Sequence, residues 1–397
     1  MKKIFILLIT FVFLMTNTVV TFASTKTKYV SEKEAIKAAE KFIKKISKHD
    51  NGWNYEKLDT PILLSDLKGN KNAYMVKLIN QGKAVGYIIV SATKDKMPVL
   101  AASLSTPPDE QLEEIKQKAQ QLIDNNRKLG NPKYYYINPL MYIVELPIIE
   151  NGKEVDKTFY NTKSKEFVDK QTIDLLKNID IQPTNAVEAN KVWEATLNDD
   201  SLNSSIEVSP QGYSEKYNDI TAFDSINYNQ DASSYPENAC GPTAGAMLLQ
   251  YWKTKGYPNI RGVSYYGSVG RFIDHLKIDM NTGSLGTTAP NWLSGVLHHA
   301  NVEGGYHFQG SHSTPPSYST YTSEIDKSKP VGIRFNNLPY ISGHYYSWHF
   351  VLGRGYYYDT SLGDREIKIN DSWGGTDWFN YDEYYDHLTF IYITPAN

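Results

Sequence analysis

Cys240 is the only cysteine in a chain of 397 residues, and it stands directly before a segment with a helical pattern. Gly241 and Pro242 follow it, and proline is favoured in the first turn of a helix, where its missing N–H is not needed. The N–H groups and the positive dipole end of a helix stabilise a thiolate, so we expect a lowered pKa for this thiol. Such a thiol is prepared for nucleophilic attack, whereas a structural cysteine that fills core space is the plainer alternative.

Two strand-like runs near the C-terminus could supply the base and the group that orients it, both of which a thiolate nucleophile needs. HFVLGRGYYY begins at His349, REIKIND ends at Asp371, and the turn DTSLG joins them. If the hairpin closes between Tyr358 and Asp364, His349 and Asp371 lie almost opposite each other at its open end. A carboxylate on one ring nitrogen would fix the tautomer and leave the other nitrogen to take the thiol proton. Each residue alone could be an ordinary strand or turn residue, but the set with Cys240 predicts a Cys-His-Asp triad.

The remaining histidines suggest less. His344 is a rival for the base, but it sits in the loop SGHYY rather than on a strand, so it ranks second. Four others could be metal ligands, but their spacing fits no firm site: His298, His299, His307 and His312. Surface or core histidines are the better account, and we expect neither a metal nor a cofactor.

The length of the chain favours two domains. The segment NDDSLNSSIEVSPQG at residues 198–212 is rich in Asn, Ser and Asp and is the clearest linker. We therefore place an N-terminal α+β domain at residues 24–197 and a second domain at residues 213–397. The second domain holds the cysteine and all but one of the histidines.

The N-terminal domain mixes helix and strand patterns and carries no nucleophile. SEKEAIKAAEKFIKKI reads as an amphipathic helix that begins with a capping box of Ser31 and Glu34. Apolar runs flank NQGK and again ENGK, which is typical of two β-hairpins, and PVLAASLS reads as a further strand. PDEQLEEIKQKAQQLIDNNRKLG reads as a second helix that Gly130 ends.

The first residues, MKKIFILLITFVFLMTNTVVTFASTK, have the pattern of a secretory signal peptide. A membrane anchor is the alternative, but the apolar run is short for a span of about 20 residues. We place the signal at residues 1–23 and expect a secreted, extracellular protein that has no membrane partner once the signal is removed. The net charge of −3 gives no bulk attraction to polyanions, so we expect no nucleic-acid partner either.

CGPTAGAMLLQYW resembles the nucleophile helix of papain-fold cysteine peptidases. Its Cys-Gly-Pro form is most similar to the bacterial group related to the bacteriocin-processing, double-glycine leader peptidases. HFVLGRGY resembles the histidine strand of that group, INDSWGG resembles its aspartate-containing strand end, and GSLGTTAPNWLSGVLHHANVEGGY has the pattern of its middle region. The resemblance covers roughly residues 220–393. It implies a papain-like domain in which the nucleophile helix packs on an antiparallel β-sheet.

The resemblance also implies a side-chain amide, upstream of the cysteine, that helps to hold the oxyanion. Gln230 in INYNQDASS is the best match, although it lies ten positions before Cys240, further than the usual spacing. Asn238 is the fallback for this role. The backbone N–H of Cys240, at the start of its helix, is the other expected donor.

A second resemblance concerns the N-terminal domain. EAIKAAEKFI followed by VGYIIVSATKDKMPVLAAS is similar to the inhibitory propeptide of streptopain-type secreted cysteine peptidases. This resemblance implies that the N-terminal domain folds with the enzyme as an intramolecular inhibitor and blocks its cleft until the chain is cleaved.

These patterns predict a secreted cysteine peptidase, made as a zymogen, that hydrolyses peptide bonds in a protein or peptide substrate. Cys240 would attack, His349 would act as base and then acid, Asp371 would orient His349, and Gln230 would help to hold the oxyanion. Two alternatives stay open. The same triad could serve an amidase or isopeptidase acting on cell-wall peptide, or a transferase. The chain could also be a catalytically degenerate secreted binding or adhesion protein.

Overall fold

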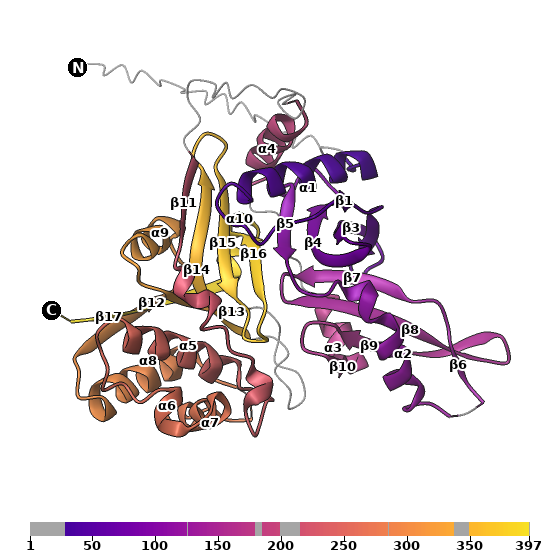
Figure 1. Cartoon of the computed structure of the whole chain (residues 1–397). Coiled ribbons are helices and arrows are strands. Elements are labelled where there is room, and N and C mark those ends of the chain that lie inside the picture. The colour runs from indigo at the N-terminus through magenta and orange to yellow at the C-terminus, as the bar shows by residue number, and fades with distance from the viewer. Residues whose placement is uncertain are drawn as a thin grey trace, which may run out of the picture.

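The computed structural model describes residues 28–124, 126–178, 185–198, 215–284, 286–336 and 349–396. The predicted signal peptide and all but the first residue of the predicted linker lie outside these ranges. Within them, no helix is both long enough and apolar enough to cross a bilayer. Figure 1 shows two lobes, with the first half of the chain in one and the second half in the other.

Helix α1 (Glu32–Ile46) opens the N-terminal lobe with the predicted capping box, because the Ser31 side chain accepts from the Glu34 N–H and Glu34 reaches back. Its apolar face packs on the hairpin of β3 (Lys71–Asn80) and β4 (Lys83–Ser91). Gln81 and Gly82 form the two-residue turn with φ of 50° and 73°, as a hairpin of this hand requires. Both predicted elements are therefore confirmed.

The rest of this lobe continues as a second group of strands with short helices beside it. The predicted hairpin at ENGK is confirmed, but the predicted second helix ends at Gln120 rather than Gly130, and a short strand occupies its last part. The remaining elements are β1 (Lys57–Leu58), β2 (Ile62–Ser65), β5 (Val99–Ser103), η1 (Pro108–Gln111), α2 (Leu112–Gln120), β6 (Lys128–Leu129), β7 (Lys133–Asn138), β8 (Met141–Glu150), β9 (Lys153–Asn161), β10 (Glu166–Val168), α3 (Lys170–Leu176) and α4 (Ala186–Asn198).

The C-terminal lobe packs a layer of helices on an antiparallel sheet (Figure 1). The helices and turns are η3 (Thr221–Asp224), η4 (Gln230–Ala232), α5 (Cys240–Thr254), α6 (Val263–Tyr266), α7 (Val269–Asp279), α8 (Ala289–His298), the π-helical turn η5 (His299–Glu303), α9 (Tyr318–Asp326), α10 (Tyr381–Tyr384) and η6 (Tyr385–His387). The strands are β11 (Glu215–Asp219), β12 (Phe308–Ser313), β13 (Val331–Phe335), β14 (His349–Asp359), β15 (Asp364–Asn370), β16 (Thr376–Asn380) and β17 (Leu388–Pro395).

Helix α5 lies against β14, the strand that begins at His349. The sheet runs in the order β12, β17, β13, β14, β15, β16, and every pair is antiparallel. This is the predicted α+β class, with the nucleophile helix packed on an antiparallel sheet.

The sheet does not stop at the boundary between the lobes. β5 of the N-terminal lobe pairs antiparallel with β16, with Ala101 opposite Phe379 and Ser103 opposite Asp377. Side chains from both lobes also share one apolar core, in which Phe42 of α1 belongs to the same cluster as Trp378 of β16. The N-terminal lobe is therefore built onto the β16 edge of the C-terminal sheet.

Candidate active site

Cys240 is the first residue of α5, as predicted, and only 7% of its surface is exposed. Gly241 has to be small, because a Cβ there would lie 2.8 Å from the Thr287 hydroxyl oxygen. The indole N–H of Trp292 donates to the Gly241 carbonyl at 2.8 Å, which fixes the first turn of the helix on α8. The residues after the cysteine therefore hold its position.

Burial raises the pKa of the Cys240 thiol, while hydrogen bonds from the backbone N–H groups of Phe350 and Gly241 act to lower it. The expected lowering by the helix start is therefore wrong for this form of the chain. The N–H donors are present, but desolvation of the thiolate outweighs them. Phe350 directly follows His349 in the chain, so the thiol lies against the backbone at the start of β14.

His349 begins β14, and its Nε2 atom lies 2.6 Å from the backbone carbonyl oxygen of Asp371. A carbonyl oxygen can only accept, so Nε2 carries the proton and Nδ1 keeps the lone pair that could take a thiol proton. The ring stacks on Trp373 with 3.7 Å between centroids and 13° between planes. The predicted neighbours do meet, but the carbonyl of Asp371 orients the ring where the carboxylate was expected.

The hairpin register explains this meeting. β14 and β15 pair from Asp359 opposite Asp364 down to Leu352 opposite Asn370, with one irregularity near Gly353. Continued by three positions, this register places His349 opposite Trp373, the residue on which its ring stacks. The predicted hairpin is confirmed, but it closes at Asp359 opposite Asp364 rather than at Tyr358.

The Asp371 carboxylate has other partners. Its Oδ1 accepts from the backbone N–H groups of Trp373 at 2.9 Å and Gly375 at 2.7 Å. The next residue, Ser372, donates its hydroxyl to the carbonyl of Phe350 at 2.8 Å, and its oxygen lies 3.4 Å from the carbonyl of Cys240. The 371–375 turn therefore ties the start of α5 to the start of β14.

Lys163 of the N-terminal lobe reaches this same turn. It lies between β9 and β10, and its ammonium nitrogen is 2.6 Å from Asp377 and 3.5 Å from Oδ2 of Asp371. Although burial acts to lower it, Asp377 and then Tyr87 and Asp371 raise the pKa of Lys163 above its ordinary value, so the ammonium stays charged. Sequence reasoning missed this residue, because a lysine in a polar turn reads as solvated.

The ionisation of His349 reflects this environment. Burial lowers the pKa of the His349 ring to about 4, the charge of Lys163 acts in the same direction, and Asp371 opposes both. The imidazole is therefore neutral near pH 7, and the Cys240 thiol, whose pKa is raised, keeps its proton. Neither candidate catalytic group carries the charge of a thiolate–imidazolium pair in this form of the chain.

The backbone of Gln230 contacts the 371–375 turn, since its N–H donates to the Ser372 carbonyl at 2.8 Å. Its side-chain Nε2 donates to the Pro236 carbonyl at 3.2 Å, and its Oε1 is buried without a hydrogen-bond partner. Asn238, the fallback, instead donates to the Ser284 carbonyl at 2.9 Å. Gln230 is therefore the better placed of the two, but its amide is engaged within its own loop. His344, the rival base, lies outside the described residues.

Comparisons with known proteins give a family match for each lobe. Residues 220–392 match the Peptidase_C39 like family, and residues 27–129 match the Spi protease inhibitor family. No curated protein matches the chain. The first match spans α5, β14 and the 371–375 turn, and the second spans α1 to β6.

Proposed function

We propose that this chain, which carries a Peptidase_C39-like domain behind a domain of the Spi protease inhibitor family, is a secreted cysteine peptidase made as a zymogen. Its substrate would be a protein or peptide. Secretion rests on the signal pattern at residues 1–23, and soluble export would follow from its removal.

The observation that carries the proposal is the meeting of three distant segments at the 371–375 turn. The Cys240 thiol lies against the N–H of Phe350, and Ser372 touches the backbone of both residues. A nucleophile beside a base whose tautomer is fixed by a third group is the arrangement that acyl transfer requires.

The chemistry follows from these positions. Nδ1 of His349 would take the thiol proton as Cys240 Sγ bonds to the substrate carbonyl carbon. His349 would then give that proton to the leaving amine as the peptide C–N bond breaks, which leaves a thioester. Water, deprotonated by His349, would hydrolyse the thioester and restore the thiol.

The N–H of Cys240 would hold the oxyanion, since the first N–H groups of a helix have no partner within it. The Gln230 amide would be the second donor after it releases the Pro236 carbonyl. Only one hydrogen bond of 3.2 Å has to break for this rotation.

Self-inhibition is supported by the way the lobes are joined. The β5–β16 pairing and Lys163 both attach the N-terminal lobe to the strand and turn that follow Asp371. Release of this lobe would remove the Lys163 charge that acts to lower the pKa of His349. An imidazolium, and with it a thiolate partner, would then become more favourable.

The test is expression of the full chain as wild type, Cys240→Ala and His349→Ala, with His298→Ala as the matched histidine control. His298 is exposed at the end of α8. We expect the wild type and the control to shorten themselves by the N-terminal lobe and to digest casein, while the other two variants stay full length and inactive. Self-processing by Cys240→Ala in isolation would refute the proposal. Digestion of purified peptidoglycan but not casein would move the assignment to a cell-wall amidase.

A further inference from the structure

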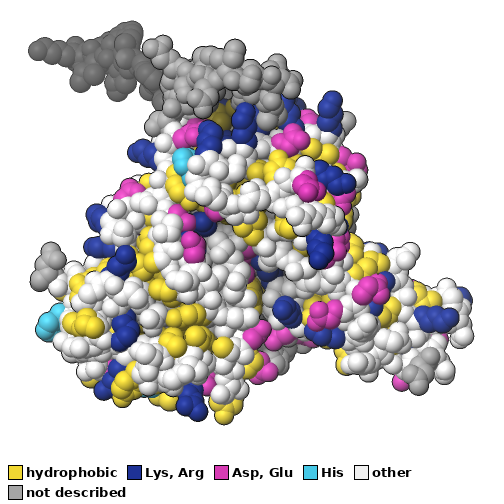
Figure 2. Space-filling view, viewed as in Figure 1, with side chains coloured by type: hydrophobic (Ala, Val, Ile, Leu, Met, Phe, Trp, Pro, Cys, Tyr) yellow, Lys and Arg dark blue, Asp and Glu magenta, His cyan; other side chains and the backbone are white. Residues whose placement is uncertain are grey.

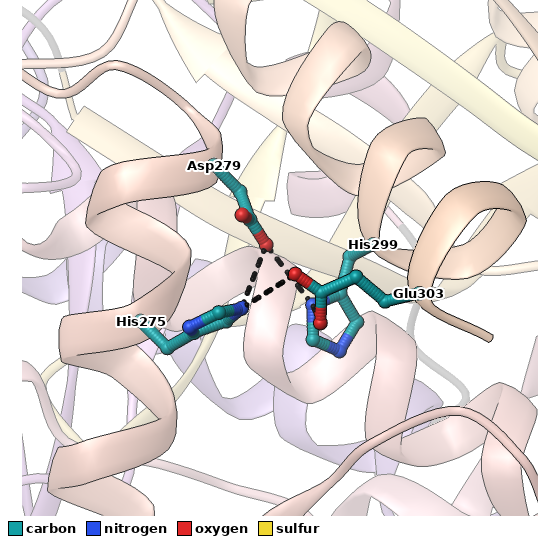
Figure 3. A group of neighbouring side chains, drawn as sticks. All are labelled: His275, Asp279, His299 and Glu303. Atoms are coloured by element: carbon teal, nitrogen blue, oxygen red, sulfur yellow. Dashed lines mark hydrogen bonds and ion pairs between the residues drawn. The ribbon is translucent and has the colours of Figure 1, made fainter.

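A second cluster of reactive side chains lies on the far side of the nucleophile helix from the sheet strand β14. Four side chains converge there from two helical segments (Figure 3): His275 and Asp279 of α7, and His299 and Glu303 of η5. One ligand atom from each lies within 4.8 Å of the others. Of the four histidines considered as metal ligands from the sequence (His298, His299, His307 and His312), only His299 belongs to this cluster, and the spacing of the histidines does not point to His275.

The spacing within each segment explains the convergence. HLKID and HANVE both place a carboxylate four residues after a histidine, and residues i and i+4 lie on the same face of a helix. The second pair sits in a π-helical turn, a conformation that is rare and often marks a functional site. Both carboxylates and both rings consequently point into one space (Figure 3).

The distances between the histidine nitrogens and the carboxylate oxygens are close to those of a four-coordinate site. His275 Nε2 lies 3.3 Å from Asp279 Oδ2 and 2.9 Å from Glu303 Oε1. His299 Nδ1 lies 3.0 Å from Asp279 Oδ2 and 3.5 Å from Glu303 Oε2. Ligands bonded to a tetrahedral zinc ion at about 2.0–2.1 Å lie about 3.3–3.4 Å apart. The four histidine–carboxylate distances, which involve both oxygens of Glu303, lie within about 0.5 Å of this separation, and a small adjustment of the side chains would bring one atom of each residue to a corner of such a site.

The tautomer of His299 points the same way. This side chain is fully buried, and its Nε2 lies 2.8 Å from the carbonyl oxygen of Arg261, so Nε2 carries the proton. In the neutral ring, the lone pair of Nδ1 then faces the Asp279 carboxylate at 3.0 Å. Because Nδ1 and the carboxylate oxygen are both acceptors, this contact needs a cation between them or a second proton on the ring. A metal-binding histidine usually donates its other ring N–H to a carboxylate, a backbone carbonyl or water. His299 has this arrangement, with Nδ1 left to face the metal.

Neighbouring side chains hold Glu303 in place and shield both histidines. Arg261 donates to Glu303 Oε2 at 3.2 Å, and the Tyr266 hydroxyl donates to the same oxygen at 3.4 Å. The Tyr266 ring lies 4.7 Å from the His275 ring, and Phe272 lies 5.5 Å from His299, which limits access of water. Hydrogen bonds to the ligating side chains orient them in metal sites, and an apolar wall keeps water out.

We propose that His275, Asp279, His299 and Glu303 bind one divalent transition-metal ion, with zinc as the best fit. Two imidazoles exclude calcium and magnesium, which take oxygen ligands, and four protein ligands leave no open position for chemistry. The site is therefore structural.

The ion would act on the peptidase domain through α7. Asp274 accepts from the Ser233 hydroxyl at 2.5 Å, and Lys277 donates to the Tyr235 carbonyl at 2.7 Å and the Glu237 carbonyl at 3.2 Å. The loop held in this way leads directly into Cys240. A metal that fixes α7 would consequently steady the loop that carries Gln230 and precedes the nucleophile.

The experiment uses the full chain with Cys240→Ser, which prevents self-cleavage and removes a competing thiolate ligand. After treatment with a chelator, the protein is titrated with Zn²⁺ or Co²⁺ at pH 7.5, and metal content, Co²⁺ absorption and Tm are measured. We expect one ion per chain, the intense visible bands of tetrahedral Co²⁺, and a higher Tm with metal.

His275→Ala and Glu303→Gln are each added to the Cys240→Ser chain. Loss of a hydrogen bond that supports a ligand weakens metal binding by about 10–100-fold, and loss of a ligand itself should weaken Co²⁺ binding by more than this. His298→Ala, one residue from His299, is the matched control and should bind as the parent does. Circular dichroism of the metal-free variants checks that they are folded. If the parent takes up no ion, or if a folded His275→Ala or Glu303→Gln variant binds as tightly as His298→Ala, the cluster is a network of protonated histidines and carboxylates and the proposal is wrong.

Discussion

Lys163 of the N-terminal lobe lies 3.5 Å from Asp371, the residue whose carbonyl oxygen orients the His349 ring. The two are separated by more than two hundred residues in sequence, and both are buried. The pair therefore joins the inhibitor-like lobe directly to the support of the candidate base. Figure 1 shows the lobes side by side along this join, at β5 and β16.

Lys163→Met should weaken the hold of the N-terminal lobe and accelerate maturation of the full chain. Removal of one partner from a buried pair costs about 3–5 kcal/mol, and each 1.4 kcal/mol that falls on docking of the lobe raises the released fraction about tenfold. We expect self-processing to be at least about tenfold faster than in the wild type, as measured by gel electrophoresis over time. Lys165→Met, an exposed residue of the same turn, is the control. Equal rates for the two variants would show that Lys163 does not hold the lobe.

The reactivity of Cys240 should rise when the N-terminal lobe leaves. In the full chain burial raises the pKa of the thiol, and His349, with its pKa lowered to about 4, offers no positive charge near neutral pH. Without Lys163 an imidazolium becomes easier to form, and each unit by which the thiol pKa falls raises the thiolate fraction about tenfold. Iodoacetamide labelling at pH 7 should therefore be at least about tenfold faster in the processed enzyme than in a full-length His349→Ala chain. A small free thiol serves as the reference, and equal rates would contradict this account.

The helix that begins at Cys240 and the hairpin that begins at His349 could be predicted from the sequence because local rules govern both. Pro242 marks the start of a helix after Cys240, and the turn before Asp364 sets a register that brings His349 to the 371–375 turn. Two features were out of reach because they depend on tertiary packing. One is the burial that raises the pKa of the thiol, and the other is the contact of Lys163 with Asp371. Long-range contacts of this kind leave no periodicity in the sequence.

The face seen in Figure 2 gives a related lesson about charge. Acidic and basic side chains of the described residues are interspersed over both lobes in this view, so this face presents no broad field of one sign. The small net charge of −3 agrees with this mixture of acidic and basic side chains. It says nothing of buried charges such as Lys163, whose effects depend on one or two neighbours.

Acidification should destabilise the folded full chain through His349. The ring has an ordinary pKa of 6.5 and a folded pKa of about 4, so between these values the unfolded chain binds the proton and the folded chain does not. The contribution of His349 to stability is therefore complete above pH 6.5 and is lost as the pH falls toward 4. A shift of this size corresponds to at most roughly 3 kcal/mol, and to less for a partly exposed ring.

This loss is measured as a difference between two chains, because other groups titrate in the same range with the opposite sign. Burial raises the pKa of Glu383 to about 7, for example, so that its contribution is lost as the pH rises. Urea unfolding of Cys240→Ser and of Cys240→Ser/His349→Gln at pH 7, 6, 5 and 4 isolates the His349 part. We expect the free energy of unfolding to fall more steeply with acid in the first chain. Parallel pH profiles would mean that His349 is not shielded from protons.

Replacement of Asp371 should separate the role of its backbone from that of its side chain. Because the carbonyl orients His349, Asp371→Asn keeps this contact, and the new amide oxygen can still accept from Trp373 and Gly375. Asp371→Ala leaves these two partly buried N–H groups without this acceptor, at a cost of at most about 1–3 kcal/mol each, and the turn that carries the carbonyl should shift.

We expect processed Asp371→Asn to keep most of its kcat/KM on a peptide substrate, with the wild-type pH profile, while Asp371→Ala loses about tenfold or more. A triad that needed the carboxylate would behave differently, because Asn would then be as damaging as Ala and would move the acidic limb of the profile. Gly375→Ala is an independent check, since a Cβ there would lie 2.5 Å from Oδ2 of Asp371 and must displace the carboxylate or the turn. If Gly375→Ala lowers kcat/KM while Asp371→Asn does not, the geometry of the turn, rather than the charge of the carboxylate, holds the base in place.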